Sequence, residues 1–285
     1  MKKDTIAKII YGICAVAFEV MMVLLEIWAD KRGTVSAEAT SIAIFGDSVV
    51  AYAQDDYCVA DRLEDYTGLK VTDLSFGGTT MAYTVEDSTL ASDRNFLSMA
   101  SIALAYAAND FALPRNYDSK APATEYFEER ERELEALDLK KTDIVIIEHC
   151  LNDYHCGVPI GDLNSDSVYT YLGALRTSVE KIRSINPNIR IIIVSPTSKW
   201  TPDGTSGSEY DYGGGVLDDY VRAQREAAEE LGAEYIYLYD IYDIAGTDYE
   251  GNEISGAGYT VDGTHPNIYG RELIAKTIAD YLNAN

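Results

Sequence analysis

A serine near the start of the chain and a histidine near its end have the residue types of a nucleophile and its base. Ser48 lies in the tripeptide Gly46-Asp47-Ser48, directly after a short apolar run. His265 follows Asp262 by three residues, just before the last helical pattern of the chain. A serine hydroxyl needs a base to take its proton, and an imidazole does so when an acceptor fixes its tautomer. The spacing therefore predicts a catalytic triad of Ser48, His265 and Asp262.

Each of these two motifs also has a purely structural interpretation. The tripeptide could be a turn glycine, a capping aspartate and the first residue of a helix. Asp262 could form an Asx turn beside a surface histidine. The chain has three histidines, and His265 alone lies in a turn with a carboxylate close by. Both motifs in one chain favour the catalytic interpretation.

Alternating apolar patterns predict the elements that position these residues. Five short runs read as strands, at 41–45, 69–75, 143–148, 189–195 and 234–239, and the third is rich in β-branched residues. Helical patterns lie between and after them, at 61–67, 124–137, 167–185, 217–231 and 268–282. This order predicts an α/β domain with a parallel sheet and helices on both faces. Ser48 then lies at the carboxyl end of a strand, where open α/β sheets bind their ligands.

Two stretches, 79–122 and 198–216, are longer than ordinary connections, and such stretches often carry function. The second contains Trp200, Tyr210 and Tyr212, which we consider as substrate-binding residues that could stack on sugar rings. An ordinary surface loop with amphipathic aromatic residues is the alternative.

Four motifs in this order resemble those of the SGNH/GDSL hydrolase family, over roughly residues 41–283. The first is Gly46-Asp47-Ser48, with Val49 in place of the leucine of the family name. The second is Phe76-Gly77-Gly78-Thr79-Thr80, where the resemblance implies Gly78 as an oxyanion-hole residue. The third is Cys150-Leu151-Asn152-Asp153, and the fourth is Asp262 to His265.

The third motif departs from the family pattern at one position. Asn152 matches the asparagine whose side chain donates to the oxyanion, so the resemblance implies an oxyanion hole made by Ser48, Gly78 and Asn152. Cys150 stands where glycine is usual, and its thiol could line the acyl pocket. Asp153 is expected to cap a helix, and His149 and His155 to be structural or pocket-lining.

The resemblance implies a three-layer α/β/α, flavodoxin-like SGNH hydrolase domain over residues 41–285, with five parallel strands. It implies a carboxylic ester hydrolase that works through an acyl-enzyme, on small acyl groups such as the acetyl groups of an extracellular glycan. An acyltransferase and a catalytically silent, surface-anchored binding protein on the same fold are the alternatives. The mechanism requires no metal or organic cofactor, and no Cys/His spacing resembles a zinc site.

The strongly negative net charge argues against nucleic acid as a partner. The net charge is −24, and residues 1–33 hold five basic and four acidic side chains, so the rest of the chain carries −25. Such a surface repels nucleic acid and anionic polymers.

The N-terminal segment has the composition of a membrane anchor. Residues 9–29 are apolar except for Glu19 and Glu26, with lysines before them and basic residues after them. We expect residues 1–33 to be a signal anchor, residues 34–40 a linker, and the catalytic domain to be extracytoplasmic. A cleaved secretory signal is the alternative. Outside the cytosol Cys150 and Cys156 could form a disulfide, whereas buried thiols are the other interpretation.

Overall fold

The computed structural model describes residues 39–84, 95–116 and 125–285. One five-stranded sheet with the order β2-β1-β3-β4-β5 forms the centre of the domain, and all its strand pairs are parallel. The strands are β1 (Ser41–Gly46), β2 (Lys70–Asp73), β3 (Ile144–Glu148), β4 (Arg190–Val194) and β5 (Glu234–Ile236). β1, β3 and β4 are almost continuously apolar and buried, as expected for strands covered on both faces.

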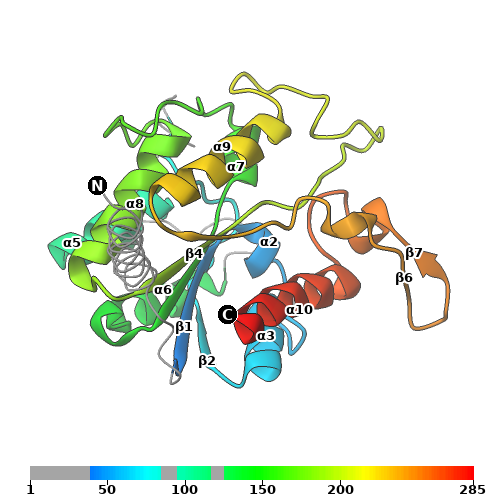
Figure 1. Cartoon of the computed structure of the whole chain (residues 1–285), viewed down its shortest axis with the longest axis horizontal. Helices are drawn as coiled ribbons and strands as arrows, with labels where there is room; N and C mark the ends of the chain where they lie inside the picture. Colours follow the sequence, from blue (N-terminus) through cyan, green and yellow to red (C-terminus); the bar gives the residue numbers. More distant parts are fainter. Residues whose placement is uncertain (1–38, 85–94, 117–124) are drawn as a thin grey trace, which may run out of the picture. The chain divides into compact units, whose positions relative to one another are not determined.

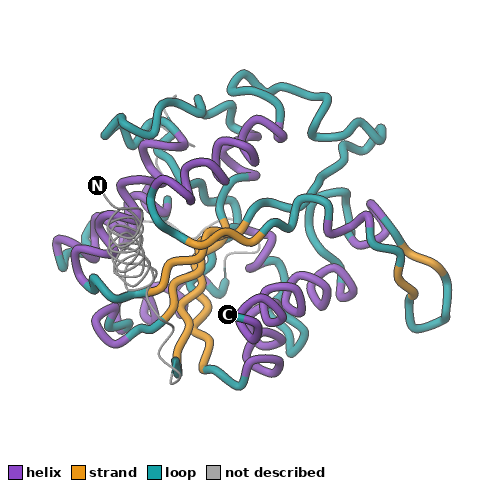
Figure 2. Tube along the Cα trace, in the orientation of Figure 1, coloured by secondary structure: helices purple, strands orange, loops and turns teal. Residues whose placement is uncertain are grey.

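Helices cover both faces of this sheet (Figures 1 and 2). α3 and α10 pack together on one face, and α5 and α8 pack together on the other. The predicted three-layer α/β/α architecture with five parallel strands is thereby confirmed. The helices are α2 (Ser48–Ala51), α3 (Val59–Thr67), α5 (Met99–Ala108), α6 (Phe127–Ala136), α7 (Leu151–His155), α8 (Tyr171–Ile185), α9 (Leu217–Glu230) and α10 (Ile268–Ala284). A small antiparallel hairpin, β6 (Gly246–Thr247) and β7 (Glu253–Ile254), lies before α10 in the chain.

The long connection predicted at residues 79–122 contains a helix, α5 (Met99–Ala108). Its sequence, MASIALAYAA, is apolar on all sides, so it shows no amphipathic period. The helix is instead mostly buried, with α8 as its main partner, while Ala107 and Ala108 at its end are exposed.

The predicted anchor, most of the predicted linker and Cys14 lie outside the described residues. Among the residues that the structure describes, no helix combines the length and the apolar character needed to cross a membrane.

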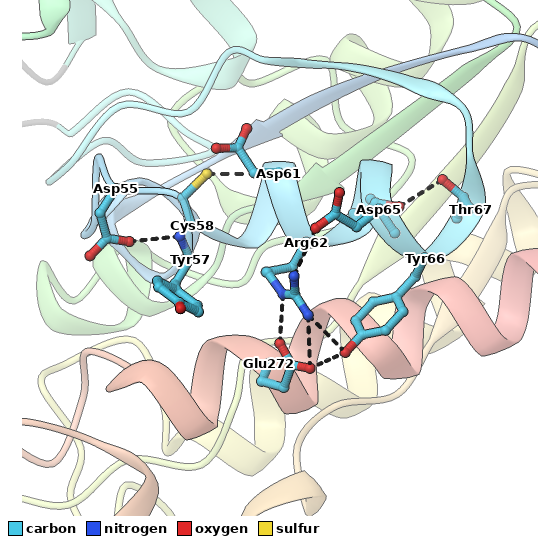
Figure 3. A network of polar contacts seen from close by, with 10 residues as sticks. Asp55, Tyr57, Cys58, Asp61, Arg62, Asp65, Tyr66, Thr67 and Glu272 are labelled. Atoms are coloured by element: carbon cyan, nitrogen blue, oxygen red, sulfur yellow. Dashed lines mark hydrogen bonds and ion pairs between the residues drawn. The ribbon is translucent and has the colours of Figure 1, made fainter.

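A polar clamp joins α3 to α10 (Figure 3). Arg62 of α3 donates from Nε and Nη2 to the two carboxylate oxygens of Glu272 in α10, at 2.8 and 3.2 Å. The Tyr66 hydroxyl donates to the same carboxylate. The contact is partly exposed, so it contributes no more than about 1 kcal/mol to stability. Since α3 follows Ser48 in the chain and α10 follows His265, the clamp holds together the two helices behind these residues.

Candidate active site

The turn after β1 places Ser48 at the carboxyl edge of the sheet. A side chain at Gly46 would bring its Cβ within 2.9 Å of Ser75 Oγ and Val50 Cγ2, so glycine is required at this point. Asp47 caps α2, because its carboxylate accepts the Val49 N–H at 2.8 Å. Ser48 is therefore the first residue of a helix, where backbone N–H groups have no acceptor within the helix.

The turn before α10 brings His265 to Ser48 across 217 residues of chain. His265 Nε2 lies 3.0 Å from Ser48 Oγ. On the other side of the ring, His265 Nδ1 lies 2.7 Å from Asp262 Oδ2. These are hydrogen-bond distances, and they connect the three residues in the order that a nucleophile, a base and an orienting carboxylate require.

Asp262 is held in its ionised form by local hydrogen bonds. Its Oδ1 accepts the N–H groups of Thr264 and His265, at 3.0 and 2.8 Å. Partial burial alone would raise the pKa of this carboxyl group. The bonds from the backbone and ring of His265 and from Thr264 outweigh burial and lower the pKa below its usual value.

Backbone donors lie beside Ser48 in the loop after β2. Gly77 is close to the nucleophile, since a Cβ built on it would lie 3.8 Å from Ser48 Cβ. The Gly77 N–H is already bonded to the Tyr126 hydroxyl at 2.9 Å. Gly78 has φ +79°, and no described group accepts its N–H. The backbone N–H of Gly78, and not that of Gly77, is therefore available to donate to a ligand.

Asn152 joins this loop to the nucleophile turn. Its Nδ2 donates to the carbonyl oxygen of Thr79 at 2.9 Å and to Asp47 Oδ2 at 3.2 Å. The structure thus brings the first, second and third motifs together at one edge of the sheet, where the fourth supplies His265.

A family model decides the assignment of the chain. The model of the GDSL-like Lipase/Acylhydrolase family matches residues 44–273, which contain all four motifs. The chain belongs to this family. Membership confirms the resemblance that the motifs predicted, and it supports ester hydrolysis as the general activity.

Solved structures of low sequence identity share the fold of this GDSL-like protein. A possible lipase from Chitinophaga pinensis is 16% identical with a TM-score of 0.56, over 86% of this chain and 98% of the other. A protein from Lactobacillus plantarum is 19% identical with a TM-score of 0.57, over 88% of this chain and 99% of the other. A comparison with curated protein sequences found no match.

The aromatic residues predicted to bind substrate in this GDSL-like protein occupy two different environments. Trp200 contacts the histidine turn through its backbone. The Trp200 N–H donates to the Gly263 carbonyl oxygen at 2.8 Å, and a Cβ built on Gly263 would lie 2.3 Å from the Trp200 carbonyl oxygen. Position 263 therefore requires glycine, both because of this close approach and because its φ is +87°. Tyr210 and Tyr212 are exposed and lie against each other, with ring centroids 4.6 Å apart.

Cys150 does not fit the prediction that it lines a substrate pocket. Its side chain is buried in the core beside Tyr171, and burial raises the pKa of the thiol. Its φ of −175° lies outside the left-handed region that favours glycine. Cys150 is an unbridged thiol, so the disulfide with Cys156 that was left open is not formed.

Three carboxyl groups are buried behind the nucleophile. Asp153 was expected to cap a helix, but it lies inside α7 and accepts the N–H groups of Met81 and Ala82 at 2.7 and 2.9 Å. Burial raises the pKa of Asp47 to about 6 and that of Asp153 to about 7, against the effect of their hydrogen bonds. Burial also raises the pKa of Glu148 well above its usual value, with the neighbouring charge of Asp47 as a second cause.

These shifts predict that the domain is more stable in mild acid than in mild base. An unfolded chain loses the protons of Asp47 and Asp153 near pH 3.8, whereas the folded domain holds them until about pH 6 to 7. Their stabilising effect is therefore complete below about pH 4 and is lost as the pH rises through 7. We expect Tm to fall by about 5 °C or more between pH 5 and pH 8 in a thermal unfolding series.

Asp47→Asn is the matched variant for this series, because asparagine can still cap α2. It should reduce the fall of Tm with rising pH, while the contribution of Asp153 and the general repulsion of the acidic surface remain. An undiminished fall of Tm in Asp47→Asn would contradict the assignment to the buried carboxyl group.

Sequence reasoning missed two residues next to the site. Tyr52 stacks on the His265 ring, with centroids 4.7 Å apart and an interplanar angle of 21°. Its position four residues after Ser48, one helical turn away, was the available signal. Lys199 contacts His155, and its ammonium lies 5.8 Å from the ring centroid of Tyr212. No sequence pattern pointed to Lys199, whose pKa is lowered by burial. Among the described residues, no group of three or more His, Cys, Asp or Glu side chains could hold a metal ion.

Proposed function

We propose that the protein hydrolyses carboxylic esters through an acyl-enzyme formed on Ser48. The observation that carries this proposal is the continuous chain of contacts from Ser48 Oγ to His265 Nε2, at 3.0 Å, and from His265 Nδ1 to Asp262 Oδ2, at 2.7 Å. A structural histidine would not need both a serine hydroxyl on one ring nitrogen and an ionised carboxylate on the other.

The geometry gives each group one role in two successive steps. Ser48 Oγ bonds to the ester carbonyl carbon while its proton moves to His265 Nε2. The tetrahedral intermediate then loses the alcohol, which takes that proton. Water repeats the sequence on the acyl-enzyme and releases the carboxylic acid and the free serine. Asp262 fixes the Nδ1–H tautomer of His265 and stabilises the imidazolium that forms in each half-reaction.

The oxyanion is stabilised by the N–H groups of Ser48 and Gly78 and by the Asn152 amide. A preorganised donor of this kind contributes roughly 3 kcal/mol to lowering the barrier. Asn152 donates its longer bond, 3.2 Å, to Asp47. A small rotation of the amide would exchange this bond for one to the oxyanion and leave the 2.9 Å bond to Thr79 in place.

Small acyl groups are the proposed substrates, with acetyl groups of an extracellular glycan as the specific case. Two aromatic residues contact groups that flank Ser48: Tyr126 accepts the Gly77 N–H, and Tyr52 stacks on His265. Tyr210 and Tyr212 present exposed rings that suit a sugar face. An extracytoplasmic, anchored location is proposed from the apolar sequence of residues 9–29 alone.

A series of p-nitrophenyl esters tests the substrate proposal. With purified full-length protein we expect kcat/KM to be highest for acetate, about tenfold lower for butyrate and lower still for octanoate, since a bulky chain must displace packed side chains. Ser48→Ala supplies the background rate for each ester. A rate that rises with chain length would overturn the small-acyl proposal and leave esterase activity itself intact.

A further inference from the structure

Tyr52 covers one face of the imidazole that the proposed mechanism uses as its base. The two rings are stacked, with centroids 4.7 Å apart and an interplanar angle of 21°. Tyr52 follows the last residue of α2, so the short helix that begins with Ser48 also places the ring over His265. Nucleophile and stacking ring are thus held by one element.

The two hydrogen bonds of His265 restrain tilting of the ring out of its plane only weakly. Both are made at the edge of the imidazole, by Nε2 to Ser48 and by Nδ1 to Asp262. A small tilt of the ring changes the two N···O distances little and weakens the bonds mainly through their angles. A flat group against one face opposes tilting towards that face, and Tyr52 is such a group.

The surroundings of the triad do not provide this restraint by burial. The side chains of His265 and Asp262 are 27% and 49% exposed. Tyr52 is itself 48% exposed, so its ring separates one imidazole face from water. Because the ring becomes an imidazolium during each half-reaction, an aromatic face also stabilises the charge that develops there.

We propose that Tyr52 is a positioning residue that acts through His265, an inference that rests on the proposed function. The restraint on the imidazole comes from the aromatic face of Tyr52. The Tyr52 hydroxyl has no hydrogen-bond partner among the described residues, so it is not needed to hold the ring.

The test compares Tyr52→Leu with Tyr52→Phe in the full-length protein, with p-nitrophenyl acetate as substrate. Leucine removes the stacking face, so kcat should fall about tenfold while KM stays within about twofold. Phenylalanine keeps the face and should retain both constants within about twofold. Tyr57→Leu, a nearby tyrosine of equal exposure that is not stacked on His265, is the matched control and should behave as the wild type.

Three results would overturn this inference. A raised KM with unchanged kcat in Tyr52→Leu would make Tyr52 a substrate-binding residue. An equal loss of kcat in Tyr52→Phe would assign the effect to the hydroxyl, and unchanged constants in Tyr52→Leu would leave the ring without a role. Failure of the proposed function is distinct, because the wild type itself would then hydrolyse the ester no faster than Ser48→Ala. Thermal unfolding of each variant separates these outcomes from misfolding.

Discussion

Ser48→Ala is expected to lower kcat for p-nitrophenyl acetate by about 10⁴-fold or more. Without the hydroxyl no acyl-enzyme can form, and the remaining groups can only assist direct attack by water. A residual rate above the uncatalysed reaction is expected, because the N–H groups of Ser48 and Gly78 and the Asn152 amide would still stabilise an oxyanion. The loss is the largest that a single substitution in this protein should produce.

Steady-state rates of purified wild type and variant measure this effect, with thermal unfolding to confirm that both are folded. The Ser48 hydroxyl has a hydrogen bond to His265, so the variant should unfold within a few degrees of the wild type. Ser184→Ala, on the exposed side of α8, is a matched control that should keep full activity. If Ser48→Ala kept more than about a tenth of the wild-type rate, Ser48 would not be the nucleophile.

Asp262→Asn is expected to lower kcat by about 10²- to 10³-fold. An amide removes the negative charge that fixes the Nδ1–H tautomer and stabilises the imidazolium. The Asp262 side chain is 49% exposed, and solvent weakens its interaction with the ring. We therefore expect a smaller loss than a fully buried carboxylate would give.

The turn should survive this change, because an asparagine oxygen can still accept the N–H groups of Thr264 and His265. Asp248 forms a similar Asx turn in the β6–β7 hairpin, where its Oδ1 accepts the N–H of Glu250, so Asp248→Asn is the matched control. Activity of Asp262→Asn equal to that of this control would mean that another group orients His265.

The sheet and the order of its motifs could be predicted because the signals are local. Strands β1, β3 and β4 are short β-branched runs, and a parallel sheet buries such runs on both faces. Ser48 and His265 each stand at the end of an element, and the fold then requires them to meet. Helix α5 was not among the predicted elements, because its apolar sequence has no periodic face to recognise.

Contacts between distant segments could not be predicted from the sequence. Asp153 has the residue type of a helix cap, yet it bonds the backbone of Met81 and Ala82, 72 and 71 residues away. Cys150 has a core position that no spacing rule indicates. The stacking of Tyr52 on His265 depends on the angle at which two turns approach each other, and that angle follows from packing of the whole domain.

Labelling with a serine-directed fluorophosphonate tests directly whether Ser48 is an activated nucleophile. Phosphorus bonds to Ser48 Oγ, fluoride leaves, and the serine proton is taken by His265, so the reaction needs the same nucleophile and base as ester hydrolysis. The account predicts that intact-mass analysis finds one adduct on the wild-type protein, that peptide mapping places it on Ser48, and that Ser48→Ala stays unmodified. A wild-type protein that remains unlabelled, or an adduct that persists in Ser48→Ala, would contradict the assignment of Ser48 as an activated nucleophile.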